Sequence, residues 1–331
     1  MILIVGGGIG GLSLAACLVR RGIECELVER EPVWTTTGGG ITLYPNGMRA
    51  LGAVGIRAEV EAAGLPLARI RMLDRGGRLL SEVPGDAWEG VGRTFTVDRK
   101  ALQRLLLGAC DGVRVRLGTA LGSIAADARG AEVGFADGSR GSYELVVGAD
   151  GIRSTVRRLC FDAAPPSYVD QLYWRSAVEA DLVACATMMF DVDRYVAVVP
   201  LGGGSTYVAF QLRRATPFDD PVERRIERLR ERFGDFASPA PEALACLDGD
   251  ASLHFGRAEE IRIDAWHAGA VALLGDAAHA CSPTMAQGGS LAVEDAVVLA
   301  EELARASEPR AALERYVARR APRTRWVRER T

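Results

Sequence analysis

The sequence has little lysine, little histidine and no clustered cysteine. Lys100 is the only lysine among 40 basic residues, and the chain has 3 histidines and 7 scattered cysteines. No C-x-x-C or H-E-x-x-H motif places these residues at metal-ligand spacing. We therefore expect no bound metal, and the isolated cysteines favour free thiols in a reducing, cytoplasmic compartment.

Long apolar segments and a strong excess of either charge are also missing. The 331 residues carry a formal net charge of −3, and no apolar run reaches the roughly 20 residues that a membrane-spanning helix needs. The opening MILIV lacks the charged start of a signal peptide. These features give no basis for nucleic-acid binding or stable membrane association. We expect a monomer or a homodimer.

The sequence does contain a βαβ unit at its start. MILIV is typical of a buried strand, GGGIGGLSLAACLVRRG of a glycine loop that opens a helix, and ECELVER of a second strand. In this G-x-G-x-x-G pattern the first glycine allows a tight turn, the second lets the backbone approach a pyrophosphate, and the third lets helix and strand pack closely. Peptide N–H groups at the helix start can bind phosphate. The predicted dinucleotide loop comprises Gly6, Gly8, Ile9, Gly10 and Gly11.

The second strand ends in Glu29 and Arg30. A carboxylate at this position can accept hydrogen bonds from both ribose hydroxyls of a dinucleotide. A glutamate rather than a cation favours an unphosphorylated adenosine ribose, as in FAD or NAD but not NADP. The alternative to dinucleotide binding is a glycine turn that serves only to pack helix against strand. That alternative does not explain why Glu29 ends the second strand.

The chain changes character near residue 165 and again near residue 266. Residues 165–265 contain stretches typical of strands, such as RYVAVVPL and STYVAFQLR, and one charged helix pattern, PVERRIERLRERFG. The buried strand and helix pattern returns at residue 271. We therefore expect an α/β fold in which a discontinuous Rossmann-like domain, 1–164 plus 266–331 with C-terminal helices, holds an inserted antiparallel β-sheet domain, 165–265, to which the family resemblance described below assigns substrate binding.

Two further strands end in an aspartate beside a glycine. They are VVGADGIRSTVR, residues 146–157, and VALLGDAAH, residues 271–279. A carboxylate such as Asp276 directly after buried apolar residues is costly unless a polar partner meets it. The alternative is that Asp276 caps the following helix.

With the N-terminal fingerprint, these motifs resemble those of the class A FAD-dependent aromatic monooxygenases, the para-hydroxybenzoate, salicylate and urate hydroxylase-like family. The resemblance spans nearly the whole chain and includes GGGITLYPNGMRAL, DRKALQRLL, GDAAHACSP and ALERYVARRAPR. It implies an FAD-binding domain, NADH or NADPH as co-substrate, and O2. The implied reaction is hydroxylation of an aromatic or heteroaromatic small molecule through a flavin hydroperoxide.

The resemblance also implies cofactor contacts. Asp276 would accept a hydrogen bond from a ribityl hydroxyl, and Arg99 would lie against the ribityl–phosphate portion. Leu121 would present backbone to the adenine, unless it is only a core residue. Asp150 and Arg153 would lie near the dinucleotide cleft and help to admit the nicotinamide. The backbone around the flavin ring would come from Gly40, Ile41, Thr42, Gln287, Gly288, Gly289 and Ser290.

One position departs from the family pattern. Relatives usually have glycine where this chain has Ala286, in the stretch PTMAQGG. A Cβ restricts positive φ angles, so we expect either a rearranged loop or a strained alanine. Either would restrict the flavin movement by which this family meets NAD(P)H.

No catalytic residue is assigned, and the substrate contacts are expected on the inserted sheet. Alternation along the strand places Tyr173 and Arg175 on one face and Trp174 on the other. Arg175 would bind a substrate carboxylate or enolate if it faced the flavin, or would be a surface residue if it did not. The remaining candidates are Arg194, Tyr195, Tyr207 and Phe210.

Other flavoprotein functions share parts of this pattern. A flavin-dependent halogenase requires a catalytic lysine and a W-x-W-x-x-I motif, and neither is present. An epoxidase, a simple dehydrogenase, or a flavin-binding protein without hydroxylase activity stays open at this point.

Overall fold

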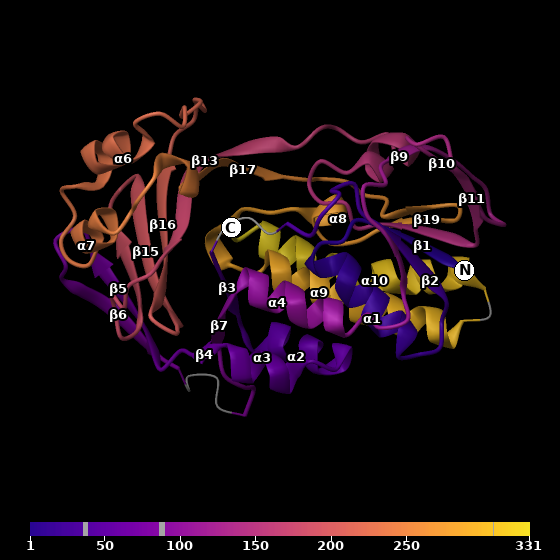
Figure 1. The fold of residues 1–331 in the computed structure, drawn as a ribbon, viewed down its shortest axis with the longest axis horizontal. Helices are drawn as coiled ribbons and strands as arrows, with labels where there is room; N and C mark the ends of the chain where they lie inside the picture. Colours follow the sequence, from indigo (N-terminus) through magenta and orange to yellow (C-terminus); the bar gives the residue numbers. More distant parts are fainter. Residues whose placement is uncertain (36–38, 86–89, 307) are drawn as a thin grey trace.

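The computed structural model describes residues 1–35, 39–85, 90–306 and 308–331. Within these ranges a mainly parallel six-stranded sheet and its helices form one half of the molecule, and a seven-stranded sheet forms the other (Figure 1). Two three-stranded sheets complete the fold. One has the order β11-β10-β9 and the other β3-β7-β4.

The six-stranded sheet has the order β18-β19-β12-β1-β2-β8. The strands β1, β2, β8, β12 and β19 pair in parallel, and β18 is the antiparallel edge. All four residues of each of β1, β2 and β12 are buried, as expected for a sheet covered on both faces. The one charged residue among them, Glu26 of β2, accepts a hydrogen bond from the Tyr143 hydroxyl. The strand bounds are β1 Ile2–Val5, β2 Cys25–Val28, β8 Arg114–Arg116, β12 Leu145–Gly148, β18 His267–Ala268 and β19 Val271–Leu273.

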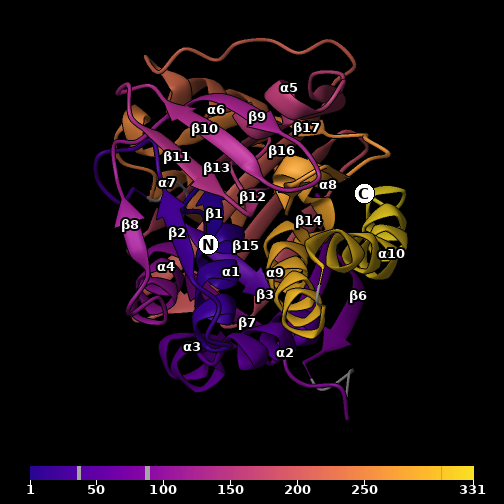
Figure 2. The same ribbon diagram turned by 90° about the vertical axis from the view of Figure 1, so that its right-hand side faces the viewer.

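A layer of helices covers one face of this sheet (Figure 2). The long helix α9 packs against α1, α2 and α10, and α1 also packs against α4. Asp98 directly precedes α4, where the sequence pattern favours a capping aspartate, and it accepts a hydrogen bond from the Ala101 N–H at 2.9 Å. The helix bounds are α1 Ile9–Val19, α2 Pro45–Val54, α3 Arg57–Ala63, α4 Arg99–Gly108, α5 Thr155–Cys160, α8 Asp276–His279, α9 Gly288–Arg305 and α10 Pro309–Arg328.

The seven-stranded sheet has the order β17-β13-β16-β15-β14-β5-β6. Its outer face carries a core of Trp174, Phe210 and their neighbours, covered by α6 (Arg225–Phe233) and α7 (Ala240–Ala245). Its inner face is directed toward the six-stranded half (Figure 1). The strand bounds are β5 Arg69–Asp74, β6 Leu79–Pro84, β13 Ser167–Val178, β14 Ala186–Phe190, β15 Arg194–Gly202, β16 Ser205–Arg213 and β17 His254–Glu260.

The seven-stranded sheet is not confined to residues 165–265. The hairpin β5–β6 lies in the segment expected on the Rossmann-like side, yet β5 pairs in parallel with β14 through Ile70–Ala186 and Met72–Met188. An amphipathic hairpin of this kind can pair with any exposed sheet edge, so its local pattern did not specify the partner. The short strands of the smaller sheets are β3 Gly40–Leu43, β4 Leu65–Pro66, β7 Phe95–Asp98, β9 Leu121–Ala126, β10 Ala131–Phe135 and β11 Arg140–Tyr143.

Candidate functional site

The turn between β1 and α1 has the geometry of a dinucleotide-binding loop. Gly6 has φ +108°, and a Cβ there would lie 2.5 Å from the Ala149 carbonyl oxygen. A Cβ at Gly11 would lie 1.9 Å from the Gly6 oxygen, so both positions exclude a side chain. Nothing lies within 4 Å of the Cβ position of Gly8, which faces open space at the start of α1. This open N-terminus can approach a phosphate closely.

Glu29 lies beside this loop, at one end of the site. Its Oε2 accepts a hydrogen bond from the Gly7 N–H at 2.8 Å, and its Oε1 accepts one from the Glu31 N–H at 3.0 Å. Glu29 and Trp34 line a cavity of about 190 Å³, which shares Gly8, Ile9 and Arg99 with a larger cleft. The carboxylate is thus held at the edge of this cavity, and its contact with a ribose stays a prediction.

Arg30 and Leu121 do not join Glu29 at this cavity. The exposed Arg30 pairs with Glu31 at 3.3 Å. Leu121 packs at the margin of the core. Its expected backbone contact with adenine remains a prediction.

The larger cleft, of about 540 Å³, lies between the two halves of the molecule. Asp276 lines it directly after the Gly275 turn, where φ is +61°. Burial raises the pKa of the Asp276 carboxyl, and His279 and Arg99 partly oppose this. The N-cap of α8 is Gly275, without a side-chain cap bond, so the capping alternative for Asp276 is wrong.

A buried network supports the Asp276 turn from behind. Asp295, fully buried on α9, accepts hydrogen bonds from the Gly275 N–H at 3.0 Å and from Arg320 Nε at 2.6 Å, and it contacts His279 Nε2 at 2.5 Å. Burial by itself raises the pKa of Asp295, but His279 and Arg320 outweigh it and lower the pKa to about 2. The sequence analysis did not identify this network, because its members lie on three separate elements.

The loop 282–289 separates this cleft from a second cavity. Ser282, Pro283, Ala286, Gly288 and Gly289 line the cleft, whereas Thr284, Met285 and Gln287 line the second cavity. Ala286 has φ +50° and ψ +32°, so the strained alternative holds. Its N–H donates to the Pro283 oxygen at 2.8 Å. A Cβ at Gly288 would lie 3.8 Å from Asp276 Oδ1, so the start of α9 is close to that carboxylate.

Ser290 and Gln287 direct their side chains away from the cleft. The Ser290 hydroxyl is buried against Gly47 of α2. The Gln287 Oε1 accepts a hydrogen bond from Asn46 Nδ2 at 3.0 Å. Their expected role at the flavin therefore rests on backbone N–H groups alone.

Two arginines face each other across the cleft. Arg99 comes from α4, and Arg175 comes from β13, where it shares the inner face with Tyr173. Each has a buried Nε atom without a hydrogen-bond partner in the described residues. Burial lowers the pKa of Arg99, and the positive charge of Arg175 lowers it further. Unpaired buried donors of like charge favour an anionic or oxygen-rich ligand between them.

Asp150 and Arg153 of the second aspartate motif have different positions. Asp150 accepts hydrogen bonds from Ser154 Oγ and from the Thr155 and Val156 N–H groups, so its carboxylate holds the start of α5. Arg153 lines the cleft and pairs with Glu259 of β17 at 2.6 Å. This ion pair joins the two halves of the molecule at the cleft.

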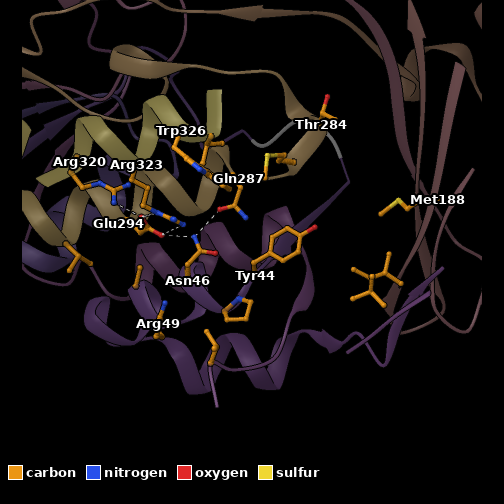
Figure 3. Close-up of a pocket in the computed structure, with 18 of the residues that line it drawn as sticks. Tyr44, Asn46, Arg49, Met188, Thr284, Gln287, Glu294, Arg320, Arg323 and Trp326 are labelled. Atoms are coloured by element: carbon orange, nitrogen blue, oxygen red, sulfur yellow. Dashed lines mark hydrogen bonds and ion pairs between the residues drawn. The ribbon is translucent and has the colours of Figure 1, made fainter. Parts of the chain in front are cut away.

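The second cavity is larger, about 950 Å³ (Figure 3). Tyr195 lines it from β15, and Tyr44 lines it from the start of α2. At one end Glu294 accepts hydrogen bonds from Asn46, Arg320 and Arg323. The opposite end lies against the seven-stranded sheet, where Met188 is directed toward Tyr44 in Figure 3.

The structure brings Arg175, Tyr195 and Tyr207 to these cavities, but not Arg194 or Phe210. Arg194 forms ion pairs with Asp191 at 2.6 Å and Asp235 at 2.7 Å. Phe210 is fully buried on the outer face, beneath α6. Because side chains alternate along β16, Tyr207 and Phe210 cannot both face inward. The prediction that Phe210 contacts the substrate together with Tyr207 is therefore wrong.

Sequence reasoning missed the apolar wall of the second cavity. Ile70 and Met72 on β5 and Met188 on β14 line it. Alternation identified them only as one face of a strand, and pairing between distant strands brings them to the site.

The cleft fits an FAD molecule. At one end are the glycine loop, where a Cβ would not fit at Gly6 or Gly11, and the Glu29 carboxylate. The adjoining cleft adds Asp276 and the buried Nε atoms of Arg99 and Arg175, which lack hydrogen-bond partners in the described residues. In the described residues there is no group of His, Cys, Asp or Glu side chains that could hold a metal ion. The same part of the chain has no helix long and apolar enough to cross a membrane.

Comparison with known proteins also indicates FAD binding. Residues 1–331 match the FAD binding domain family. The chain is 34% identical to an aurachin C monooxygenase/isomerase of Stigmatella aurantiaca, covering 97% of this chain and 85% of the relative. It is 31% identical to a 2-heptyl-3-hydroxy-4(1H)-quinolone synthase of Pseudomonas aeruginosa, covering 90% and 79%.

A solved structure agrees with this assignment. Klebsiella pneumoniae HpxO complexed with FAD and uric acid superposes with a TM-score of 0.92 at 30% identity. The match covers 100% of this chain and 86% of that one.

Proposed function

This chain belongs to the class A FAD-dependent aromatic monooxygenases, and we propose that it hydroxylates a heteroaromatic ring held between the cofactor cleft and the second cavity. FAD is its cofactor, and NAD(P)H and O2 are its co-substrates. The names of the relatives given above, an aurachin C monooxygenase/isomerase and a quinolone synthase, support a heteroaromatic ring. The observation that carries the proposal is that one loop, 282–289, lines both cavities.

The proposed cofactor contacts follow the cleft from one end to the other. Glu29 binds the ribose hydroxyls, the α1 N-terminus binds the pyrophosphate, and Arg99 and Asp276 bind the ribityl chain. Backbone of β3 and of the α9 start borders the flavin ring. Arg153 stays at the cleft entrance, paired with Glu259, where a nicotinamide cofactor would approach.

Bound FAD supplies the activated oxygen, and the chain's own residues hold the ring. Burial raises the pKa of Tyr195 and of Tyr207, so both phenols stay protonated at neutral pH. Tyr207 can donate a hydrogen bond to a ring oxygen or nitrogen, whereas the Tyr195 hydroxyl donates to Met188 Sδ at 2.7 Å and borders the ring site. The apolar residues around them limit access of bulk water, which protects a reactive oxygen species from unproductive decay.

We also propose a cytoplasmic monomer or homodimer. The seven cysteines are free thiols, and three of them are buried. Free thiols in this number are typical of a reducing compartment. Size-exclusion chromatography with light scattering measures the oligomeric state directly.

The function is tested with FAD-reconstituted protein and a panel of aromatic and heteroaromatic compounds. A true substrate accelerates NAD(P)H oxidation and yields a hydroxylated product. Tyr207→Phe should lower the yield of product per NAD(P)H, whereas Tyr168→Phe should not, because Tyr168 donates to the Arg214 oxygen away from both cavities. Failure of every ring compound to accelerate NAD(P)H oxidation would refute the proposal.

A further inference from the structure

The inner face of the seven-stranded sheet carries a charged side chain at one end and apolar side chains at the other. Strand pairing places Met72, Met188, Ala197, Ala209 and Arg175 side by side, one from each of five neighbouring strands. The row therefore runs from a cation at the cofactor cleft, over two alanines, to two methionines at the second cavity. Because the row crosses the strands, all five side chains point toward the same layer of space.

The two alanines lie between two tyrosines: Ala209 lines the cofactor cleft and the buried Ala197 pairs with it, and we call this pair the floor. Tyr195 precedes Ala197 by two residues on β15, and Tyr207 precedes Ala209 by two residues on the antiparallel strand β16. The tyrosines therefore lie on opposite sides of the alanine pair. A flat ring can rest on this floor beside the loop 282–289, with a phenol at each side.

Beyond the floor, the described residues of β5, β6 and β14 that line the second cavity are all apolar. They form the apolar wall, and its members on the inner face are Ile70, Met72, Val83, Met188 and Phe190. Ala50 and Ala53 of α2 and Val297 and Val298 of α9 line the cavity across from it. In Figure 3 Met188 of this wall lies on the opposite side of the cavity from Glu294.

The charges of the second cavity are largely compensated. Glu294 pairs with Arg320 at 2.5 Å and with Arg323 at 2.8 Å, and Asp295 also binds Arg320. Arg49 lines the cavity from the exposed side of α2. The cavity thus offers no buried uncompensated cation, within the described residues, to a substrate carboxylate. Its volume of about 950 Å³ lies near the top of the range for small-molecule sites, about 300–1,000 Å³.

We propose that the substrate is an aromatic ring that carries an apolar chain, with the ring over Ala197 and Ala209 and the chain along Met188 and Met72. This assignment rests on the proposed function and names the substrate class of that site. A compact ring alone leaves the apolar wall in contact with water. An attached chain removes that wall from water, and each buried methylene then adds to affinity.

The test is a chain-length series on one ring. 2-Alkyl-4-quinolones from methyl to nonyl are titrated into the FAD-loaded protein, and binding is read from the change in flavin absorbance. Affinity should rise about threefold to fourfold per methylene until the cavity is filled, which over the six methylenes from methyl to heptyl is about 700-fold to 4,000-fold. Uric acid, a ring without a chain, should bind no better than the methyl compound.

Substitutions in the wall should remove the dependence on chain length. Met188→Gln places a polar group in the path of the chain, and Met188→Leu keeps it apolar. Val83→Gln is matched with Leu79→Gln, because both residues lie on β6 but Leu79 is half-exposed and outside the cavity. The Met188→Gln and Val83→Gln variants should bind the heptyl compound at least tenfold more weakly and the methyl compound equally. The Met188→Leu and Leu79→Gln variants should show the same dependence of affinity on chain length as the wild type.

The possible outcomes separate this inference from the proposed function. Equal affinity from methyl to heptyl, with the ring still hydroxylated, would overturn the chain site and leave the function standing. Binding that rises with chain length without any hydroxylated product would support the chain site and overturn the proposed function.

Discussion

The two ends of one sheet face carry different chemistry. At the β13 end, Arg175 and Tyr173 face the cofactor cleft together with Arg99, and the buried Nε atoms of both arginines find no hydrogen-bond partner in the part of the chain that the structure describes. At the β14–β5–β6 end, Met188, Met72 and Val83 face the second cavity. The polar end is suited to a charged cofactor, and the apolar end is suited to an uncharged hydrocarbon.

The difference shows how one scaffold separates two binding tasks. The loop 282–289 lies between the ends and contributes residues to both cavities. Behind it, two consecutive residues of α9, Glu294 and Asp295, form hydrogen bonds at different cavities. Asp295 holds the Gly275 turn of the cofactor cleft, whereas Glu294 binds Asn46 at the second cavity. Arg320 joins the two ends, because it pairs with both carboxylates.

The largest effect is expected from Asp295→Ala. The substitution leaves the buried Arg320 without one of its two carboxylates and the Gly275 N–H without an acceptor. Loss of one partner of a buried ion pair costs about 3–5 kcal/mol of unfolding free energy. Urea denaturation of the FAD-free protein measures this loss. The surface variant Glu314→Ala, which removes an exposed pair with Arg310, should cost less than about 1 kcal/mol.

The pH dependence of stability gives a second view of Asp295. Its pKa in the folded protein is lowered to about 2, so its contribution to stability is present above the unfolded pKa, about 3.9. This contribution is lost as the pH falls from the unfolded value toward the folded one. Equal acid sensitivity of Asp295→Ala and wild type in this range would contradict the role assigned to the network.

Glu29→Gln should weaken FAD binding by about 1.5–3 kcal/mol, the range for hydrogen bonds to a charged group. Its neighbour Glu31 lines the same small cavity but is exposed and pairs with Arg30, so Glu31→Gln is the matched control. Fluorescence titration of FAD-free protein measures both. Unchanged FAD affinity in Glu29→Gln would show that the glutamate only holds the Gly7 N–H.

Asp276 should make FAD binding depend on pH. Burial raises the pKa of its carboxyl in the FAD-free protein, and a ribityl hydroxyl donates only to the ionised form with full strength. Affinity should therefore fall as the pH is lowered through this raised pKa, by at most about tenfold per pH unit. The Asp276→Asn variant should lack this component. Parallel pH profiles for the two proteins would exclude Asp276 as the titrating group.

The smallest effect is expected at the boundary between the two ends. Ala286 has φ +50°, which costs a residue with a Cβ about 1 kcal/mol. We expect Ala286→Gly to relax the loop and to speed flavin reduction by NAD(P)H up to about fivefold, which is the rate equivalent of that strain, with FAD affinity unchanged. Anaerobic stopped-flow reduction is the measurement, with Ala280→Gly, at negative φ, as control. A variant that reduces no faster would mean that Ala286 does not limit flavin movement.

The cofactor end was largely predictable from the sequence. The glycine loop, Glu29, Asp98 and the Asp276 turn each depend on a few neighbouring residues whose spacing reports their geometry. Alternation also predicted that Tyr173 and Arg175 share a face opposite Trp174, and the structure confirms this. These features depend on residues that are close in the sequence, so they can be recognised without knowledge of the fold.

The apolar end was not predictable, because it depends on pairing between distant strands. Nothing near Ile70 indicates that β5 joins β14, which begins more than 100 residues later. The same limit explains the error at Phe210. Alternation shows that Phe210 and Tyr207 face opposite sides, but only α6 and α7 determine which side is covered.

The most direct test of this account follows the oxygen atom. FAD-loaded protein, NAD(P)H and a 2-alkyl-4-quinolone are incubated under ¹⁸O2, and the product is analysed by mass spectrometry. Our account predicts one ¹⁸O atom in the ring of the product, together with a higher yield per NAD(P)H for the heptyl than for the methyl compound. NAD(P)H oxidation that produces only hydrogen peroxide, with no ¹⁸O in any ring compound tested, would contradict it.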